Sequence, residues 1–297
     1  MRVDAADPSG TFAPLGPETV SEVVTSGDWT FGVHRQGTGT PVVLLHGLLT
    51  DSRVWLPVMA GLRHEHPVVA VDGPGHGLAP ARGTPYTLEE EVDRLADAYR
   101  ALGDGRPTVW VGHSMGGMKA LRMALRHPSL VSGLVLVDTQ PYAEPESTAR
   151  PFLAMVETVL SYGMSEDLAR MVARLNFHRS FQGSDPARYW IDHFRTLTGE
   201  RIEQACNSVY TRGDIADLLP GITVPTLVVH GSGDVPIRPP VAARYTTLLP
   251  HARLVELPDT GHTPPVERPI ELLALIEEFL KAGARAQSSP TSALEDQ

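Results

Sequence analysis

The sequence predicts an α/β fold, a mostly parallel sheet with helices on both faces and an inserted helical cap. Short continuous apolar runs at residues 42–45, 68–71 and 130–137 are typical of strands that are buried on both faces. Segments with helical patterns alternate with these runs, which favours parallel pairing of the strands. The strand pattern stops at residue 139 and resumes only at Thr226, so a mostly helical segment is inserted between two strands, and we call it the cap.

The elements outside the cap follow one another with recognisable signals. Residues 22–35 form two alternating runs around Gly27 and Asp28, which indicates a hairpin. Thr87 and Glu90 match a capping box, so a helix is expected from there to about residue 102. Further on, the pattern predicts strands at 109–111, 226–229 and 254–257, a helix over 118–126, and a last helix that opens at Pro269.

Helical patterns fill the cap at 152–160, 165–175, 186–197 and 200–209. They carry many methionine and aromatic side chains, and methionine adapts its shape easily to a ligand. We expect some of these side chains to form an apolar pocket wall; the alternative is that each one holds the cap to itself and to the core. The residues assigned to the pocket are Phe152, Met155, Met164, Phe177 and Trp190.

The chain divides into five segments on composition and pattern. Residues 1–18 are rich in Pro, Gly and Asp, and residues 283–297 in Ser, Ala and Gln, so both ends are predicted to be disordered tails. Between them we expect a first core part at 19–138, the cap at 139–219 and a second core part at 220–282.

The most informative motif is Gly-His-Ser-Met-Gly at residues 112–116. A buried strand precedes this G-x-S-x-G pattern and a helix follows it, which is the context of a nucleophile elbow. Such a turn exposes the serine hydroxyl at the edge of the sheet, so Ser114 is the predicted nucleophile. The backbone N–H of Met115, at the start of the helix, and that of Leu48, after another strand, are the predicted oxyanion hole.

A serine nucleophile needs a base, and the C-terminal third of the chain supplies one. Asp234 and His262 each follow a predicted strand, so the chain order is Ser114, Asp234, His262. His262 would accept the serine proton, and Asp234 would hold the imidazole tautomer. Asp138, directly after the strand at 134–137, is the alternative acid. His113 is expected to point away from Ser114.

With these residues in view, the chain resembles the α/β-hydrolase superfamily, most closely its lid-bearing serine esterase, lactonase and cofactor-free haloperoxidase-like group. The resemblance rests on the motifs at 44–47, 72–77, 112–116, 231–234 and 261–262. It implies the α/β-hydrolase fold, with an eight-stranded sheet and a cap inserted after the strand at 130–137. It also implies a peracid-forming side activity.

The residue at the elbow narrows the reaction that the resemblance implies. Epoxide hydrolases and haloalkane dehalogenases of this superfamily carry aspartate where Ser114 stands, so those activities are disfavoured. We expect a carboxylesterase or lactonase that cleaves a small to medium apolar ester or lactone through an acyl-enzyme on Ser114. Two alternatives stay open: a carbon–carbon bond hydrolase or lyase that uses the same triad, and a non-catalytic small-ligand receptor.

Composition excludes several other classes of function. The formal net charge of the 297 residues is −10, which disfavours nucleic acid and anionic membranes as partners and leaves a small-molecule substrate. The single cysteine, Cys206, allows no intrachain disulfide, and no histidine spacing indicates a metal. We expect no cofactor. The sequence shows no secretory signal, so we expect a cytoplasmic protein. No pattern in the sequence predicts an oligomeric state.

Overall fold

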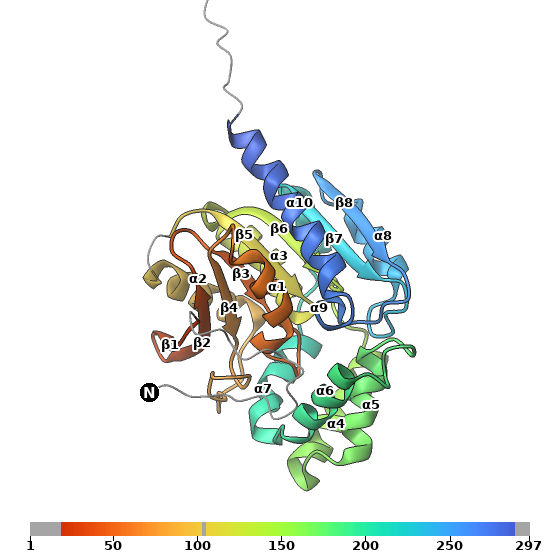
Figure 1. The fold of residues 1–297 in the computed structure, drawn as a ribbon. Coiled ribbons are helices and arrows are strands. Elements are labelled where there is room, and N and C mark those ends of the chain that lie inside the picture. Colours follow the sequence, from red (N-terminus) through yellow and green to blue (C-terminus); the bar gives the residue numbers. More distant parts are fainter. Residues whose placement is uncertain (1–18, 103–104, 289–297) are drawn as a thin grey trace, which may run out of the picture.

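The computed structural model describes residues 19–102 and 105–288, and an eight-stranded sheet is its centre (Figure 1). The strands lie in the order β1-β2-β4-β3-β5-β6-β7-β8. The pairs β1–β2 and β2–β4 are antiparallel, and every other neighbouring pair is parallel. The strands are β1 (Val20–Ser26), β2 (Trp29–Gln36), β3 (Val42–Leu45), β4 (Val68–Asp72), β5 (Thr108–His113), β6 (Val131–Val137), β7 (Thr226–Gly231) and β8 (Ala252–Leu257).

Alternate residues of the central strands enter two separate apolar clusters, one on each face of the sheet. In β3, Val42 and Leu44 belong to one cluster, while Val43 and Leu45 belong to the other. In β7, Leu227 and Val229 belong to the first cluster, and Val228 belongs to the second. This period of two follows from the pleat of a strand, and it explains why these strands are apolar at every position.

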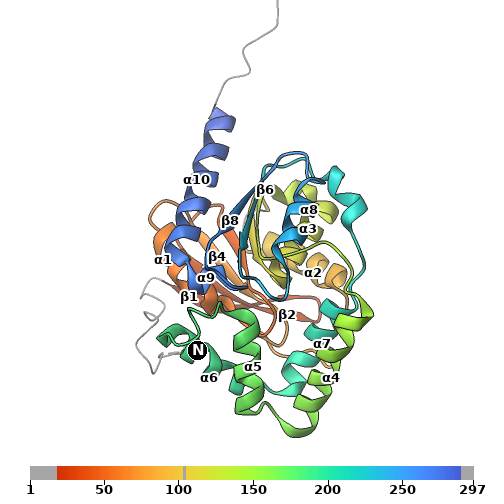
Figure 2. The ribbon, with the colours of Figure 1, turned by 90° about the vertical axis from the view of Figure 1, so that its right-hand side faces the viewer.

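Helices cover both faces of the sheet, as Figure 2 shows. On one face lie α1 (Leu56–Leu62) and α10 (Pro269–Ser288), whose buried side chains join the cluster of Val42. On the other face lie α2 (Leu88–Ala101), α3 (Met115–Arg126) and α8 (Pro239–Thr246). The short helical segments are η1 (Ser52–Trp55), η2 (Pro128–Leu130), η3 (Ala216–Gly221) and α9 (Pro264–Glu267).

Four helices between β6 and β7 gather at one end of the sheet (Figure 1). The start of α3, after β5, and residues of these helices line a common cavity. The helices therefore cover the end of the sheet at which the parallel strands terminate. They are α4 (Glu146–Tyr162), α5 (Glu166–Asn176), α6 (Asp185–Arg195) and α7 (Gly199–Tyr210).

The structure differs from the sequence analysis at the C-terminal end. The expected tail at 283–297 does not begin at 283, because α10 continues to Ser288. Residues 283–288 lack an apolar stripe, but they include alanine, arginine and glutamine, which favour a helix. The rest of that tail, and the expected tail at 1–18, lie outside the described residues. Within the described ranges, no helix combines the length and the apolar character that a bilayer span requires.

Candidate active site

Ser114 stands in a strained turn between β5 and α3. Its backbone has φ 50° and ψ −114°, a conformation that costs free energy for any residue except glycine. The turn is tight enough that a Cβ on Gly112 would overlap the Gly116 carbonyl, and one on Gly116 would overlap the Leu45 carbonyl. Glycine is therefore required on both sides of the serine, which accounts for the motif.

Three side chains form an unbroken chain of hydrogen bonds at this turn. The Ser114 Oγ lies 2.9 Å from Nε2 of His262, and Nδ1 of the same imidazole lies 2.8 Å from Oδ2 of Asp234. All three residues are buried, with Ser114 8% exposed. The neutral imidazole accepts the serine proton at Nε2 and donates its own N–H to the carboxylate. The arrangement can remove a proton from the serine hydroxyl.

The backbone of His262 is fixed from two directions. Its N–H donates to the carbonyl of Asn176 at 2.8 Å, and its carbonyl accepts from Nε2 of His113 at 2.6 Å. This bond explains the position of the His113 ring, which holds the backbone of His262 in place. Burial lowers the pKa of His113 to about 3, so the ring stays neutral.

Glu267 holds the loop around His262, a role that the sequence analysis missed. Its carboxylate accepts backbone N–H bonds from Gly261 at 3.0 Å, Thr263 at 3.1 Å and His178 at 2.8 Å. The last of these ties the loop to the segment after α5 of the cap. Glu267 lies in the four-residue helix α9, where no periodic pattern marks a buried acid.

Burial changes the pKa values of His262 and Asp234, the two residues joined to Ser114 by hydrogen bonds. Loss of solvent lowers the pKa of His262 below its ordinary value of 6.5. It raises the pKa of Asp234 to about 8, although the hydrogen bond from the Ile237 N–H opposes that rise. Both shifts show that an isolated charge is costly here. A positive imidazolium that forms beside the Asp234 carboxylate therefore has a strong partner.

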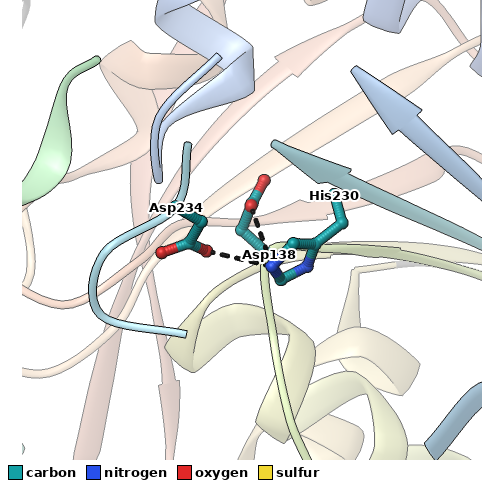
Figure 3. Close-up of side chains that lie close together, drawn as sticks. All are labelled: Asp138, His230 and Asp234. Carbon is teal, nitrogen blue, oxygen red and sulfur yellow. Dashed lines mark ion pairs between the residues drawn. The ribbon is translucent and has the colours of Figure 1, made fainter. Parts of the chain in front are cut away.

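Asp138 lies close to the triad but does not contact its imidazole. Figure 3 shows the carboxylates of Asp138 and Asp234 both facing the ring of His230. Oδ1 of Asp138 accepts the Gly231 N–H at 2.9 Å, and no hydrogen bond joins it to His262 among the described residues. Burial and the neighbouring Asp234 carboxylate raise the pKa of Asp138 well above its ordinary value. The geometry thus favours Asp234 as the acid.

The same three side chains are close enough to be considered as metal ligands, with their ligand atoms within 4.8 Å of one another. However, Nε2 of His230 donates to the carbonyl of Ile237 at 2.7 Å, so this nitrogen has no lone pair for an ion. Backbone N–H groups already occupy one oxygen of each carboxylate. The donor set fits a hydrogen-bonded cluster better than a metal centre.

Two backbone N–H groups are available near the serine hydroxyl. Met115 is the first residue of α3, and its N–H has no acceptor within the helix. The Leu48 N–H has no hydrogen-bond partner among the described residues, and Leu48 lines the same cavity as Ser114. The loop that carries Leu48 is held in place, because His76 Nε2 accepts the Leu49 N–H at 3.2 Å and His46 Nδ1 donates to the Gly47 carbonyl at 2.7 Å.

The cavity above Ser114 is lined by core and cap together. Of the five residues predicted to form the pocket wall, Phe152 and Met155 are among those that line it. Met164, Phe177 and Trp190 do not; they pack in the apolar cluster that joins the cap to the core. Trp190 is 0% exposed, so no ligand reaches it. An amphipathic pattern shows that a side chain is buried, but not whether a cavity or another helix lies against it.

Cys206 of α7 also lines this cavity. Burial raises the pKa of its thiol to about 12, so the nucleophilic thiolate does not form at neutral pH. Ser114, in contrast, has a hydrogen-bonded imidazole beside its hydroxyl, and Cys206 is part of the wall.

The sequence matches a family model and curated proteins, and the structure superposes on solved structures. The model of the alpha/beta hydrolase family matches residues 42–275. A 2-(acetamidomethylene)succinate hydrolase from Mesorhizobium japonicum is 28% identical over 89% of this chain and 96% of its own. A pimeloyl-[acyl-carrier protein] methyl ester esterase from Aromatoleum aromaticum is 32% identical over 81% of this chain and 98% of its own. A thermophilic esterase from Thermogutta terrifontis superposes with a TM-score of 0.83 at 26% identity, over 89% of this chain and 99% of that structure.

The chain therefore belongs to the alpha/beta hydrolase family, and the fold that the sequence predicts is confirmed. Its similarity to these relatives spans nearly their whole length, so the chain is a hydrolase built on this fold.

Proposed function

We propose that the chain is a serine hydrolase that cleaves a small to medium apolar ester or lactone through an acyl-enzyme on Ser114. The observation that carries the proposal is the hydrogen-bonded series Asp234–His262–Ser114, with distances of 2.8 and 2.9 Å, at the floor of a covered cavity. The names of the similar esterases support an ester as the substrate.

In the first half of the reaction, Oγ of Ser114 attacks the substrate carbonyl while its proton passes to Nε2 of His262. The carbonyl oxygen becomes an oxyanion, which the N–H groups of Leu48 and Met115 stabilise. Asp234 accepts the Nδ1–H bond of the imidazolium that forms. As the tetrahedral intermediate collapses, the alcohol leaves with the proton from Nε2, and the acyl group stays on Ser114.

In the second half, a water molecule attacks the acyl carbonyl and gives its proton to Nε2 of His262. Collapse of the second intermediate releases the acid and returns the proton to Oγ of Ser114. Every proton that His262 takes is thus given back, and no further reactant is consumed. For a lactone the same steps open the ring, because alcohol and acid belong to one molecule.

The cavity favours apolar substrates, which leads to a prediction on substrate choice. Much of the lining is apolar, and burial of apolar surface contributes about 25 cal/mol per Å². We expect the highest kcat/KM for neutral esters and lactones in a panel of p-nitrophenyl acyl esters, aryl esters, lactones, a peptide amide and a phosphodiester. The cap disfavours an extended peptide because it covers Ser114.

Other outcomes of the panel would contradict this proposal. Highest activity on the amide or the phosphodiester would overturn the substrate class. Cleavage confined to vinylogous 1,5-diketones would instead indicate a carbon–carbon bond hydrolase. Tight binding of an apolar ligand without turnover of any substrate would indicate a receptor.

A second prediction concerns the pH dependence of kcat/KM. His262 must be neutral to act as the base, and burial lowers its pKa below 6.5. Activity is therefore present above this lowered pKa and is lost as the pH falls through it, so the acid limb is expected below the ordinary histidine value. The measurement is kcat/KM for a neutral ester across the acid range. An acid limb centred above pH 6.5 would be inconsistent with a buried neutral imidazole as the base.

A further inference from the structure

Part of the lining of the cavity above Ser114 is polar, in contrast to the apolar remainder. Gln140 and Glu144 line it from the segment between β6 and α4, Thr148 from the first turn of α4, and Arg212 from the residues after α7. No pattern in the sequence indicates a charged pair here, because its two members are 68 residues apart in the chain. Both members of the pair are part of the cavity wall.

The cation of this pair is not available to a ligand. The Arg212 guanidinium donates from Nε to the Tyr142 carbonyl at 2.9 Å, from Nη1 to the Val209 carbonyl at 2.6 Å, and from Nη2 to Oε2 of Glu144 at 2.8 Å. Its side chain is 0% exposed. A substrate carboxylate would have to displace these partners to reach the charge.

The carboxylate of Glu144 is the part that a ligand can reach. Its side chain is 11% exposed, and both of its described hydrogen bonds end on one oxygen. Oε2 accepts from Arg212 and, at 3.3 Å, from the amide nitrogen of Gln140. Oε1 accepts no hydrogen bond from the described residues. A carboxylate has acceptor capacity on both oxygens, so one acceptor is left at the cavity wall.

We infer that Glu144 selects substrates that carry a neutral O–H or N–H donor where they meet this polar part of the lining, and that it excludes substrates with a carboxylate there. The inference rests on the proposed function, which places the carbonyl at Ser114. A donor group satisfies the open oxygen of Glu144, whereas an anion meets a like charge whose countercharge is already engaged. The stacked rings of Phe152 and Tyr210, with centroids 4.8 Å apart, belong to the apolar part of the same lining and favour an apolar portion of the substrate.

The test uses three p-nitrophenyl esters of equal chain length that end in a methyl, a hydroxyl or a carboxylate group. For the unaltered protein we expect kcat/KM to be about tenfold higher for the hydroxyl ester than for the methyl ester, since hydrogen bonds to charged groups are the stronger ones. The carboxylate ester is expected to be the poorest of the three.

Two variants test whether the charge of Glu144, and not the shape of its side chain, sets the preference among the three esters. In Glu144→Gln, one amide oxygen still accepts from Arg212, and an NH2 group takes the place of the open acceptor. The carboxylate ester should then gain about tenfold relative to the methyl ester. In the double variant Glu144→Leu with Arg212→Met, both charges are removed together, and the preference for the hydroxyl ester should disappear. Glu146→Gln, an exposed acid two residues further on, is the control and should change none of these ratios.

The result that overturns the inference is a set of equal ratios in the unaltered protein and in Glu144→Gln while all three esters are hydrolysed. Because only ratios between esters are compared, a partial loss of folded protein does not affect them. Hydrolysis of none of the three esters by the unaltered protein would instead contradict the proposed function, and the inference with it.

Discussion

Ester turnover is expected to fall by about 10⁶-fold when Ser114 is replaced by alanine, which is the scale of loss when a triad serine is removed from a hydrolase. The variant lacks the atom that attacks the carbonyl, and no second nucleophile with a partner base lines the cavity among the described residues. Alanine adopts the φ of 50° at a cost similar to that of serine, so the fold should persist. The measurement is kcat for a p-nitrophenyl ester, with the melting temperature as the check on folding.

Ser161→Ala is the matched control for this variant. Ser161 is exposed near the end of α4, and its replacement should leave turnover unchanged. Near-native turnover by Ser114→Ala would show that the reaction does not pass through this serine.

Asp234→Asn is expected to reduce turnover by about 10⁴-fold while the fold is retained. The reason lies in the two partners of the carboxylate, because Oδ1 accepts from the Ile237 N–H at 2.9 Å and Oδ2 accepts from Nδ1 of His262 at 2.8 Å. An asparagine has only one oxygen. If this oxygen stays on Ile237, its NH2 group faces Nδ1 and forces the proton onto Nε2, so the imidazole no longer accepts from Ser114.

Asp138→Asn is the matched variant and should cost much less. The amide oxygen can still accept the Gly231 N–H, and no hydrogen bond joins Asp138 to His262 among the described residues. Comparison of kcat for the two variants with one ester decides between the acids. A larger loss for Asp138→Asn than for Asp234→Asn would move the triad acid to Asp138.

The parts of the site that the sequence predicts are those set by local geometry. Ser114 is recognisable because a strand, a tight turn between two glycines and a helix follow one another within a few residues. Asp234 and His262 each come directly after a parallel strand, and the carboxyl ends of such strands meet at one edge of the sheet. The structure places these three side chains in one hydrogen-bonded series.

The remaining parts depend on contacts between segments that are distant in the chain. The large apolar side chains of Trp190 and Phe177 predict a place in the pocket wall, yet they fill the junction of the cap with the core. Glu144 and Arg212 form their ion pair only after α4 to α7 have packed over the sheet. Glu267 holds the loop of His262 by accepting hydrogen bonds from backbone N–H groups. A pattern of polar and apolar side chains does not indicate such bonds.

The most direct test of the central proposal, a covalent acyl-enzyme on Ser114, is labelling with a serine-directed alkyl phosphonate ester followed by mass mapping of the adduct. A phosphonate reacts with an activated serine and keeps the phosphorus on Oγ, so one adduct is expected, on the peptide that contains Ser114. Labelling should fall to background in Ser114→Ala and should be strongly slowed in Asp234→Asn. An adduct on a different residue, or no adduct under conditions where the protein hydrolyses esters, would contradict the account.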